Sequence, residues 1–204
     1  MSTTPTTPAQ EQVSAHYRAL VAAHGAAPAG TQMSAEGQRF RFEKLMEVAD
    51  LAGSTVLDLG CGTGAFYPFL RGRFPDVRYT GLDILPEMID VARRTHAGAR
   101  FVCHDVLAAG ALPEAYDFVL ASVLFNNARP DADDFMRAML RAAFAATRRA
   151  LAFNFISTHV NRVDAELAYH HPADVLRFCL DELGPRVALH HHYERCDVSV
   201  FCYR

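Results

Sequence analysis

The stretch TVLDLGCGTGAF, from Thr55 to Phe66, constrains the fold of this chain more than any other segment. It begins with a short apolar run over Val56–Leu59, which is typical of a strand buried on both faces of a parallel sheet. Glycines follow that let the backbone adopt positive φ and let a ligand approach the main chain without meeting a Cβ: Gly60, Gly62 and Gly64. Ala65 then opens a helix whose free N–H groups face the same ligand. The segment therefore predicts a strand, a turn and a helix that cradle a cofactor.

The choice of cofactor depends on Asp58, which precedes the first glycine on the predicted strand. A glycine-rich turn between a strand and a helix can simply provide tight packing, and its G-x-G-x-x-G/A pattern alone is a weak signal. As a binding site, it fits either a nicotinamide or flavin dinucleotide or S-adenosylmethionine (SAM). A carboxylate repels a pyrophosphate, whereas SAM carries an ammonium and a sulfonium cation and no phosphate. Asp58 therefore favours SAM.

From Asp58 to Gly64 the chain matches the pattern D-x-G-x-G-x-G, and there it resembles motif I of the class I SAM-dependent methyltransferases. The resemblance extends from about Ser34 to the C-terminus. It implies SAM as the cofactor and S-adenosylhomocysteine as the product, and it gives Cys61 a backbone role in cofactor binding rather than a nucleophilic one.

Length and charge favour a single domain that acts on a small molecule. With 204 residues, half of them hydrophobic, it is long enough for one well-buried core and short for two domains. The net charge is −3 without a basic block, so we expect no nucleic acid and no membrane partner. A segment with the character of a secretory signal or a membrane span is not expected, which predicts a cytoplasmic protein. The cysteines outside the glycine turn are expected to be reduced, buried thiols.

The N-terminal region precedes the first predicted strand. Residues 1–9, rich in Thr and Pro, have too little apolar surface to offset the entropy of ordering, which predicts a flexible tail. A helical pattern runs from Gln10 to Gly25, and a second begins at the N-cap Ser34 and ends near Ala49. The resemblance implies that residues 10–52 form a helical lid over SAM and the substrate; a helical pair covering a sheet edge is the alternative. Residues 53–204 are predicted to form the SAM-binding core of one overall domain.

The remaining chain alternates apolar strand runs with helical patterns. Further parallel strands are predicted at Val77–Leu82, Arg100–Cys103, Tyr116–Ser122 and Ala150–Ile156, with Asp131 capping a helix through Thr147 and a last helix from Pro172 to about Leu183. The runs Val187–Tyr193 and Asp197–Tyr203 are joined by a link too short for a parallel crossover, so they form an antiparallel hairpin. The predicted fold is α/β: a doubly wound, mostly parallel seven-stranded sheet with a C-terminal antiparallel hairpin and helices on both faces.

Further cofactor contacts follow from the ends of these strands. Asp83 ends the second strand and follows Gly64 at about the 20-residue distance of an acid that binds a ribose diol. The resemblance implies that Asp105 accepts a hydrogen bond from the adenine amino group and that the Val106 N–H bonds the ring. Three more residues are predicted beside the cofactor because they follow or end these strands or begin the next helix: Ile84, Met88 and Ser122.

Substrate residues are predicted beyond the carboxyl ends of strands four and five, where open α/β sheets bind ligands. His159, just past the fifth strand, is the candidate general base, and an exposed loop histidine is the alternative. The candidate substrate-binding residues are Tyr17, Phe125, Asn126, Asn127, Asn154, Tyr169 and His170. An aromatic loop packed on the lid is the alternative for the last two, and a buried amide bonded to backbone is the alternative for the asparagines.

No metal site is predicted, because in the run His190-His191-His192 neighbouring side chains alternate faces and no third ligand is placed by the sequence. The predicted function is transfer of the SAM methyl group to an O or N nucleophile of a small metabolite, ahead of a C nucleophile, by in-line displacement that depends mainly on positioning. The alternatives are a SAM-binding protein without transferase activity and an NAD-dependent oxidoreductase. The sequence predicts neither the oligomeric state nor the acceptor.

Overall fold

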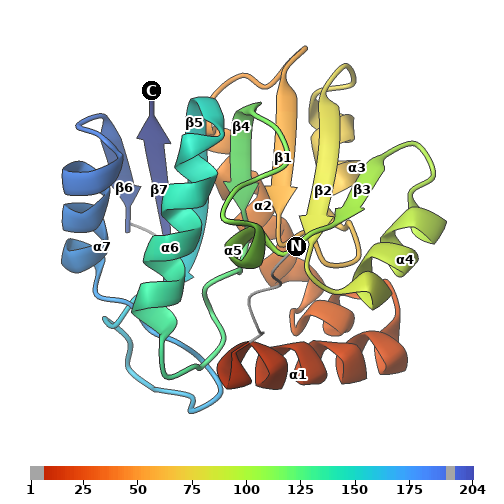
Figure 1. Ribbon diagram of the computed structural model, residues 1–204, viewed down its shortest axis with the longest axis horizontal. Helices are drawn as coiled ribbons and strands as arrows, with labels where there is room; N and C mark the ends of the chain where they lie inside the picture. The colour runs from red at the N-terminus through yellow and green to blue at the C-terminus, as the bar shows by residue number, and fades with distance from the viewer. Residues whose placement is uncertain (1–6, 192–195) are drawn as a thin grey trace.

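The computed structural model of the protein describes residues 7–191 and 196–204, and over these residues seven strands form a single sheet (Figure 1). Its strand order is β3-β2-β1-β4-β5-β7-β6. The strands are β1 Thr55–Leu59, β2 Arg78–Asp83, β3 Arg100–Cys103, β4 Tyr116–Ala121, β5 Thr147–Ile156, β6 Val187–His190 and β7 Asp197–Tyr203. Strands β1 to β5 are parallel, and β7 lies antiparallel between β5 and β6. The predicted fold class is confirmed.

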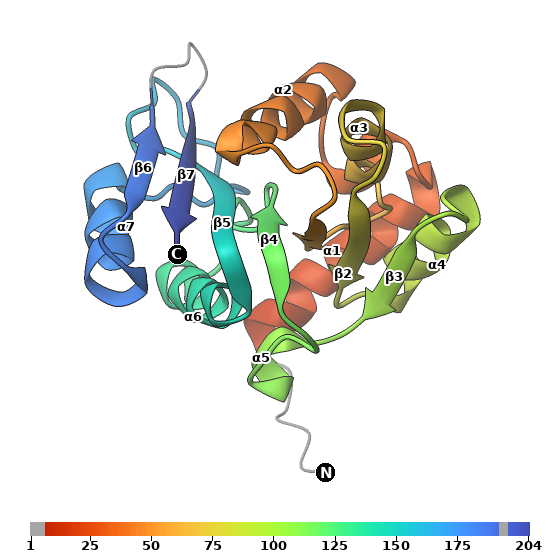
Figure 2. The same cartoon turned by 90° about the horizontal axis from the view of Figure 1, so that it is seen from above.

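Helices cover both faces of this sheet (Figure 2). They are α1 Pro8–His24, α2 Ala35–Leu45, α3 Phe66–Arg73, α4 Pro86–Thr95, α5 Val106–Ala109, α6 Ala132–Ala145 and α7 Pro172–Phe178, with short 3₁₀ turns at Pro28–Thr31 and Met46–Val48 and a π turn at Cys179–Leu183. Helices α2 and α3 lie on one face, and α6 and α7 lie on the other. Helix α1 belongs to neither layer: it crosses the edge of the sheet at which β1 and β2 end.

The apolar core is divided by the sheet into two large clusters. One contains Met136 and Leu140 of α6 and Val175 of α7, and the other contains Phe42 of α2 and Phe66 of α3. The Phe42 and Phe66 rings stack with centroids 4.2 Å apart, so α2 is built into the core. Burying side chains of this size stabilises the fold by about 1.5–3 kcal/mol each relative to exposure. The sheet and its two layers therefore form a rigid platform.

The helix ends follow the capping residues, with local differences from the sequence-based boundaries. The Thr7 hydroxyl accepts from the Gln10 N–H, so α1 begins at Pro8 and the predicted tail ends earlier than residue 9. Residues 1–6 of that tail lie outside the described residues. Helix α2 starts after Ser34, whose hydroxyl caps the Gly37 N–H, as predicted. Helix α6 ends before Thr147, because that residue already pairs with β4 as the start of β5.

Two smaller sequence expectations are corrected. All five cysteines lie in the described part of the chain and are free thiols, but Cys103 and Cys196 are exposed rather than buried, because they flank strand ends. Strand β6 ends at His190, earlier than predicted. His192 and Tyr193 lie outside the described residues.

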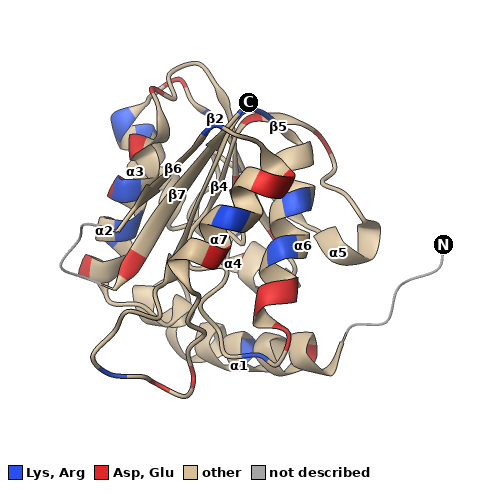
Figure 3. Cartoon of the chain, turned by 90° about the vertical axis from the view of Figure 1, so that its left-hand side faces the viewer, with Lys and Arg blue, Asp and Glu red and all other residues tan. Residues whose placement is uncertain are grey.

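Basic and acidic side chains occur together on the helices on the side of the molecule shown in Figure 3. Arg141 of α6 and Glu182 of the π turn form a bidentate ion pair at 2.6 and 3.0 Å, which joins the two elements at the surface. Because both side chains are about half exposed, the pair contributes about 1 kcal/mol at most. Among the described helices, none is long and apolar enough to cross a membrane.

Candidate functional site

A cavity of about 400 Å³ lies beyond the carboxyl ends of β1, β2 and β4, between the glycine turn and α1. In an open α/β sheet, this is the edge at which the strand order reverses and ligands bind. Here the reversal falls between β1 and β4. The topology therefore places the cavity at the predicted edge.

The glycine turn, Gly60–Gly64, forms the floor of the cavity with its main chain. The Gly60 and Cys61 N–H groups donate to the Leu82 carbonyl at 2.8 and 2.9 Å, which ties the turn to the end of β2. Gly60 has φ of 75°, and a Cβ there would lie 2.8 Å from Leu124 Cδ1. Gly62 has φ of 53°, and a Cβ there would lie 2.9 Å from Thr31 Cγ2. Both conformation and space therefore require glycine where the cavity meets the main chain.

Gly64 serves the fold and does not line the cavity. Its φ is 79°, and an added Cβ would lie 2.7 Å from the Phe101 ring, which also occupies the space over Gly81. The structure therefore gives Gly64 a packing role, in contrast to its predicted contact with the cofactor.

Asp58, at the end of β1, lines the cavity and is 3% exposed. Its Oδ2 accepts a hydrogen bond of 2.8 Å from the Tyr79 hydroxyl. Burial raises the pKa of Asp58 to about 7, against the opposing effect of the Tyr79 hydrogen bond. The carboxyl group is therefore poised to ionise when a cation lies beside it.

Asp83, at the end of β2, is fixed by two backbone donors. Gly62 N–H donates to Oδ2 and Leu85 N–H donates to Oδ1, both at 2.9 Å. Burial raises the pKa of Asp83, and these N–H groups oppose the shift. Because each carboxylate oxygen can accept more than one hydrogen bond, a lone pair on each remains for a diol.

Asp105 follows β3 and lines the cavity together with Val106. Its Oδ1 caps α5 by accepting from Leu107 N–H at 3.1 Å and Ala108 N–H at 3.0 Å. The other residues predicted beside the cofactor, Ile84, Met88 and Ser122, line the cavity as well. The Ser122 hydroxyl is buried and has no partner among the described residues. An unpaired buried hydroxyl indicates a place for a polar ligand atom.

The far wall of the cavity, opposite the glycine turn, consists of Tyr17, Phe125, Asn127, Phe135 and Met139. The Asn127 amide donates to the Tyr17 hydroxyl at 3.0 Å, which links the loop after β4 to α1. Burial is the main cause that raises the pKa of Tyr17. Phe135 and Met139 come from α6, where Met139 also belongs to a main core cluster and Phe135 packs against that cluster.

The predicted asparagines Asn126 and Asn154 are buried but do not line the cavity. Asn154 Oδ1 instead accepts from the Val123 N–H at 2.7 Å. Val123 lines the cavity and has φ of 64°, a strained conformation for a β-branched residue. Asn154 therefore positions the strained turn after β4. Of the two roles considered from the sequence, it has that of a buried amide bonded to backbone.

The predicted residues of the segment after β5 also lie away from the cavity. His159 is exposed, with its ring near those of His171 and His191 at centroid distances of 5.7 and 5.9 Å. His170 is buried and contacts Asp133 Oδ1 at 2.7 Å and the Phe125 carbonyl at 3.1 Å. The Tyr169 hydroxyl accepts from the Asp164 N–H at 2.8 Å. The structure thus does not place His159, His170 or Tyr169 at the cavity, because this loop packs beside α6 rather than over the strand ends.

Sequence reasoning missed Arg129, which lines the cavity. Its guanidinium donates to both carboxylate oxygens of Asp131, at 2.6 and 2.9 Å. Asp131 stands at the N-cap position of α6 but makes no capping hydrogen bond, because its carboxylate is used by Arg129. A single arginine between Ala128 and Pro130 of a loop carries no pattern, so only the fold reveals its burial.

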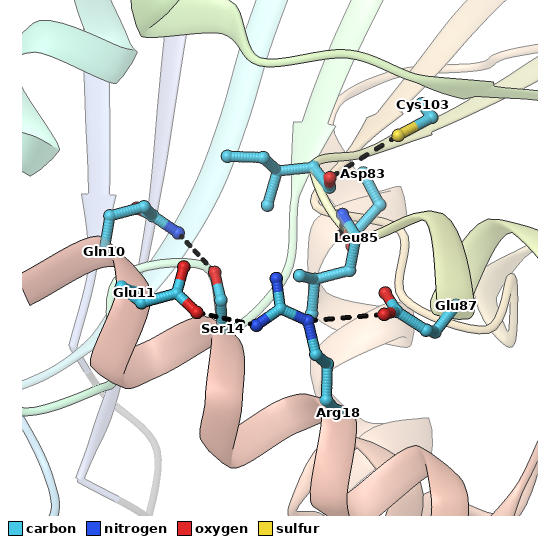
Figure 4. A network of polar contacts seen from close by, with 9 residues as sticks. Gln10, Glu11, Ser14, Arg18, Asp83, Leu85, Glu87 and Cys103 are labelled. Carbon is cyan, nitrogen blue, oxygen red and sulfur yellow. Dashed lines mark hydrogen bonds and ion pairs between the residues drawn. The ribbon is translucent and has the colours of Figure 1, made fainter. Parts of the chain in front are cut away.

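Helix α1 closes the cavity through a sparse set of contacts (Figure 4). Arg18 pairs with Glu11 of the same helix at 2.8 Å and reaches Glu87 of α4 at 3.3 Å. Val21 packs on Leu85 and Met88 in a small apolar cluster separate from the two large ones. The helix is therefore held to α4 by Glu87 and this small cluster, and to the loop after β4 by the Asn127–Tyr17 and Arg129–Gln10 hydrogen bonds.

Comparison with known proteins places this geometry in a family. Residues 56–145 match the family model described as a methyltransferase domain. A Mycobacterium tuberculosis protein named as a methyltransferase without a stated substrate is 30% identical over 148 residues, which cover 68% of this chain and 86% of that protein. The malonyl-[acyl-carrier protein] O-methyltransferase of Acetivibrio thermocellus is 35% identical and the trans-aconitate 2-methyltransferase of Paracidovorax citrulli is 40% identical. These matches cover 45% and 43% of this chain and only 34% of each relative.

Solved structures share the whole fold. A DhpI complex with SAM superposes with a TM-score of 0.73 at 17% identity over 98% of this chain and 99% of that chain. Human N-acetylserotonin methyltransferase in complex with SAM gives a TM-score of 0.72 at 16% identity, covering 97% of this chain and 60% of that chain. The residues present fit SAM, since the main chain of Gly60–Gly62 lines the cavity, acids end successive strands and the buried Ser122 hydroxyl has no partner among the described residues. The chain belongs to the class I SAM-dependent methyltransferases.

Proposed function

We propose that the chain transfers the methyl group of SAM to an oxygen or nitrogen nucleophile of a small molecule, and we favour oxygen. One observation carries the proposal: a single cavity joins the glycine turn and the strand-end acids to the far wall of Tyr17, Phe125, Asn127, Phe135 and Met139. Cofactor and acceptor can therefore occupy one enclosed space. The named O-methyltransferases among the relatives support oxygen as the acceptor atom.

The cofactor side of the cavity is assigned from its donors and charges. The two Asp83 oxygens, held by Gly62 and Leu85, are proposed to accept from the ribose hydroxyls. Asp105 and Val106 are proposed to bind the adenine ring. Asp58 is proposed to face the positively charged end of SAM, because a nearby cation stabilises its ionised form. Because Gly60, Cys61 and Gly62 line the cavity, the cofactor is proposed to lie against this turn.

The acceptor side is proposed to work by positioning. Bound SAM supplies an electrophilic methyl group on a sulfonium, so the protein must mainly align the acceptor for in-line attack, which is worth roughly 7–11 kcal/mol. Among the described residues of the far wall there is no histidine. His104 lines the cavity beside Asp105, where its Nε2 contacts the Ala111 carbonyl at 2.9 Å. The arrangement favours an acceptor that is already nucleophilic, and His159 is not retained as the base.

The proposed lid is α1 rather than the whole segment 10–52. Phe42 and Leu45 place α2 in a main core cluster, and Arg41 of α2 pairs with the buried Asp197 of β7 at 2.7 Å. Helix α1, by contrast, has its own small cluster and contributes Tyr17 to the cavity. Movement of α1 alone would open the cavity.

The test is methyl transfer from labelled SAM to a panel of small carboxylic acids, phenols and amines. We expect at least one methylated product, and we expect Asn127→Ala to lower kcat/KM about 3- to 10-fold, as for loss of one hydrogen bond, without changing S-adenosylhomocysteine affinity. The matched control is Asn161→Ala, an exposed asparagine away from the cavity. Cofactor binding without turnover of any acceptor would contradict the proposal and favour a SAM-binding protein without transferase activity.

A further inference from the structure

Arg129 is the one lysine or arginine among the described residues that line the cavity. Its side chain is 7% exposed. It also borders a second, more open cavity of about 550 Å³, which shares Arg129, Asp131, Ala132 and Asp134 with the first. The Arg129 side chain therefore lies where the first cavity meets the second, more open one.

The guanidinium keeps unused donors in spite of its partners. Asp131 takes the Nε and one Nη2 hydrogen, and Gln10 Oε1 of α1 accepts from Nη1 at 3.3 Å. The guanidinium lies 3.9 Å from the centroid of the Phe135 ring, which fixes its plane against the far wall. Of its five N–H groups, these contacts among the described residues leave one on Nη1 and one on Nη2. The free Nη2 N–H lies on the outer edge, which Nη2 shares with Nη1 and which faces away from the Asp131 contacts, and this edge can bind a carboxylate.

Within the Arg129–Asp131 pair, the cation is the more enclosed partner. The Asp131 side chain is 40% exposed and is hydrated, whereas Arg129 is enclosed. The Arg129 hydrogen bond also lowers the pKa of Asp131, so this acid stays ionised and holds the guanidinium in place. Water screens the exposed carboxylate more than the enclosed cation. A ligand inside the cavity therefore experiences mainly the positive partner of the pair.

We propose that Arg129 is a specificity-determining residue that binds a carboxylate of the acceptor molecule. This rests on the proposed function, because it assigns the acceptor to the far wall beside Phe135. The ligand class is a small acid whose carbon skeleton packs on Phe125, Phe135 and Met139. Asp131 acts as a positioning residue, since it holds the inner edge of the guanidinium so that the outer edge faces the ligand.

The experiment measures binding of matched acids and amides to the full chain saturated with S-adenosylhomocysteine. The probes are octanoate against octanamide and phenylacetate against phenylacetamide, titrated by calorimetry. We expect at least one acid to bind about 10- to 100-fold more tightly than its amide. Arg129→Gln should remove this preference, and Arg129→Lys should retain part of it, because lysine keeps the charge but not the planar edge. Arg71→Gln, at an exposed position of α3 that lines neither cavity, is the matched control and should behave as the unmodified chain.

Unchanged S-adenosylhomocysteine affinity and melting temperature in Arg129→Gln show that the variant is folded. The inference is overturned if no acid binds more tightly than its amide in the unmodified chain, or if the preference survives in Arg129→Gln. Because the readout is binding without turnover, this failure is distinct from failure of the proposed function, which is judged by methyl transfer to the wider panel of phenols and amines.

Discussion

Asp58, Asp83 and Asp105 end successive strands but have different surroundings. Asp83 and Asp105 each accept from two backbone N–H groups, whereas Asp58 accepts from the Tyr79 hydroxyl alone. Hydrogen bonds to an ionised carboxylate lower its pKa, and burial raises it. Asp58, with one such bond and 3% exposure, is therefore the acid with a pKa of about 7.

This shift makes stability depend on pH in the absence of the cofactor. Because the pKa of Asp58 is about 7 when folded and 3.8 ordinarily, the folded chain binds the extra proton. Its contribution is fully present below about pH 4 and is lost as the pH rises to about 7, by up to roughly 4 kcal/mol at 1.36 kcal/mol per unit. Urea denaturation from pH 4.5 to 7.5 should show this loss in the unmodified chain but not in Asp58→Asn. Parallel curves for the two proteins would contradict the assignment.

At the scale of the elements, α1 is distinguished from the other helices by how it is attached. The helix is bounded by the Thr7 cap and by Gly25, whose φ of 57° ends it. Its apolar attachment is Val21 on Leu85 and Met88, with Tyr17 alongside. Helices with few buried contacts open at lower free energy than the core.

Val21→Ala should therefore loosen α1 selectively. Removing two methyl groups costs roughly 1–2 kcal/mol of packing against Leu85 and Met88. Amide hydrogen exchange should accelerate about 5- to 30-fold over α1, while exchange in β1 and β4 changes little. The control is Val163→Ala, an exposed apolar residue away from α1. Equal acceleration in α1 and the sheet would show that α1 does not open as a unit.

The sequence predicts the elements well where one physical pattern dominates. The apolar run of β1, the glycines after it and the N-cap Ser34 act locally, and the structure has each element where these signals place it. The predicted roles of the residues after β5 depended on the path of a loop, and that path is set by packing against α6. His159 therefore lies at the surface. Asn154 was correctly placed in a strand, but its side chain bonds the Val123 N–H, and Arg129 was missed because no local pattern marks it.

At the scale of the whole molecule, the family match covers the cofactor side of the cavity and most of the far wall, including Phe125, Asn127, Phe135 and Met139, but not α1. The family model covers residues 56–145, which include the glycine turn and the acids at the ends of β1, β2 and β3. Tyr17 and Gln10 come from α1, outside that match. Helix α1 is therefore the part of the cavity wall that lies outside the family match.

The most direct test of the account is calorimetric titration of S-adenosylhomocysteine into the unmodified chain, Asp83→Ala and Asp90→Ala. Asp90 is an exposed acid on α4 and serves as the control. We expect the unmodified chain and Asp90→Ala to bind equally, and Asp83→Ala to bind about 10- to 100-fold more weakly, from loss of hydrogen bonds to a charged group. Absence of binding to the unmodified chain, or equal affinity in folded Asp83→Ala, would contradict the assigned site.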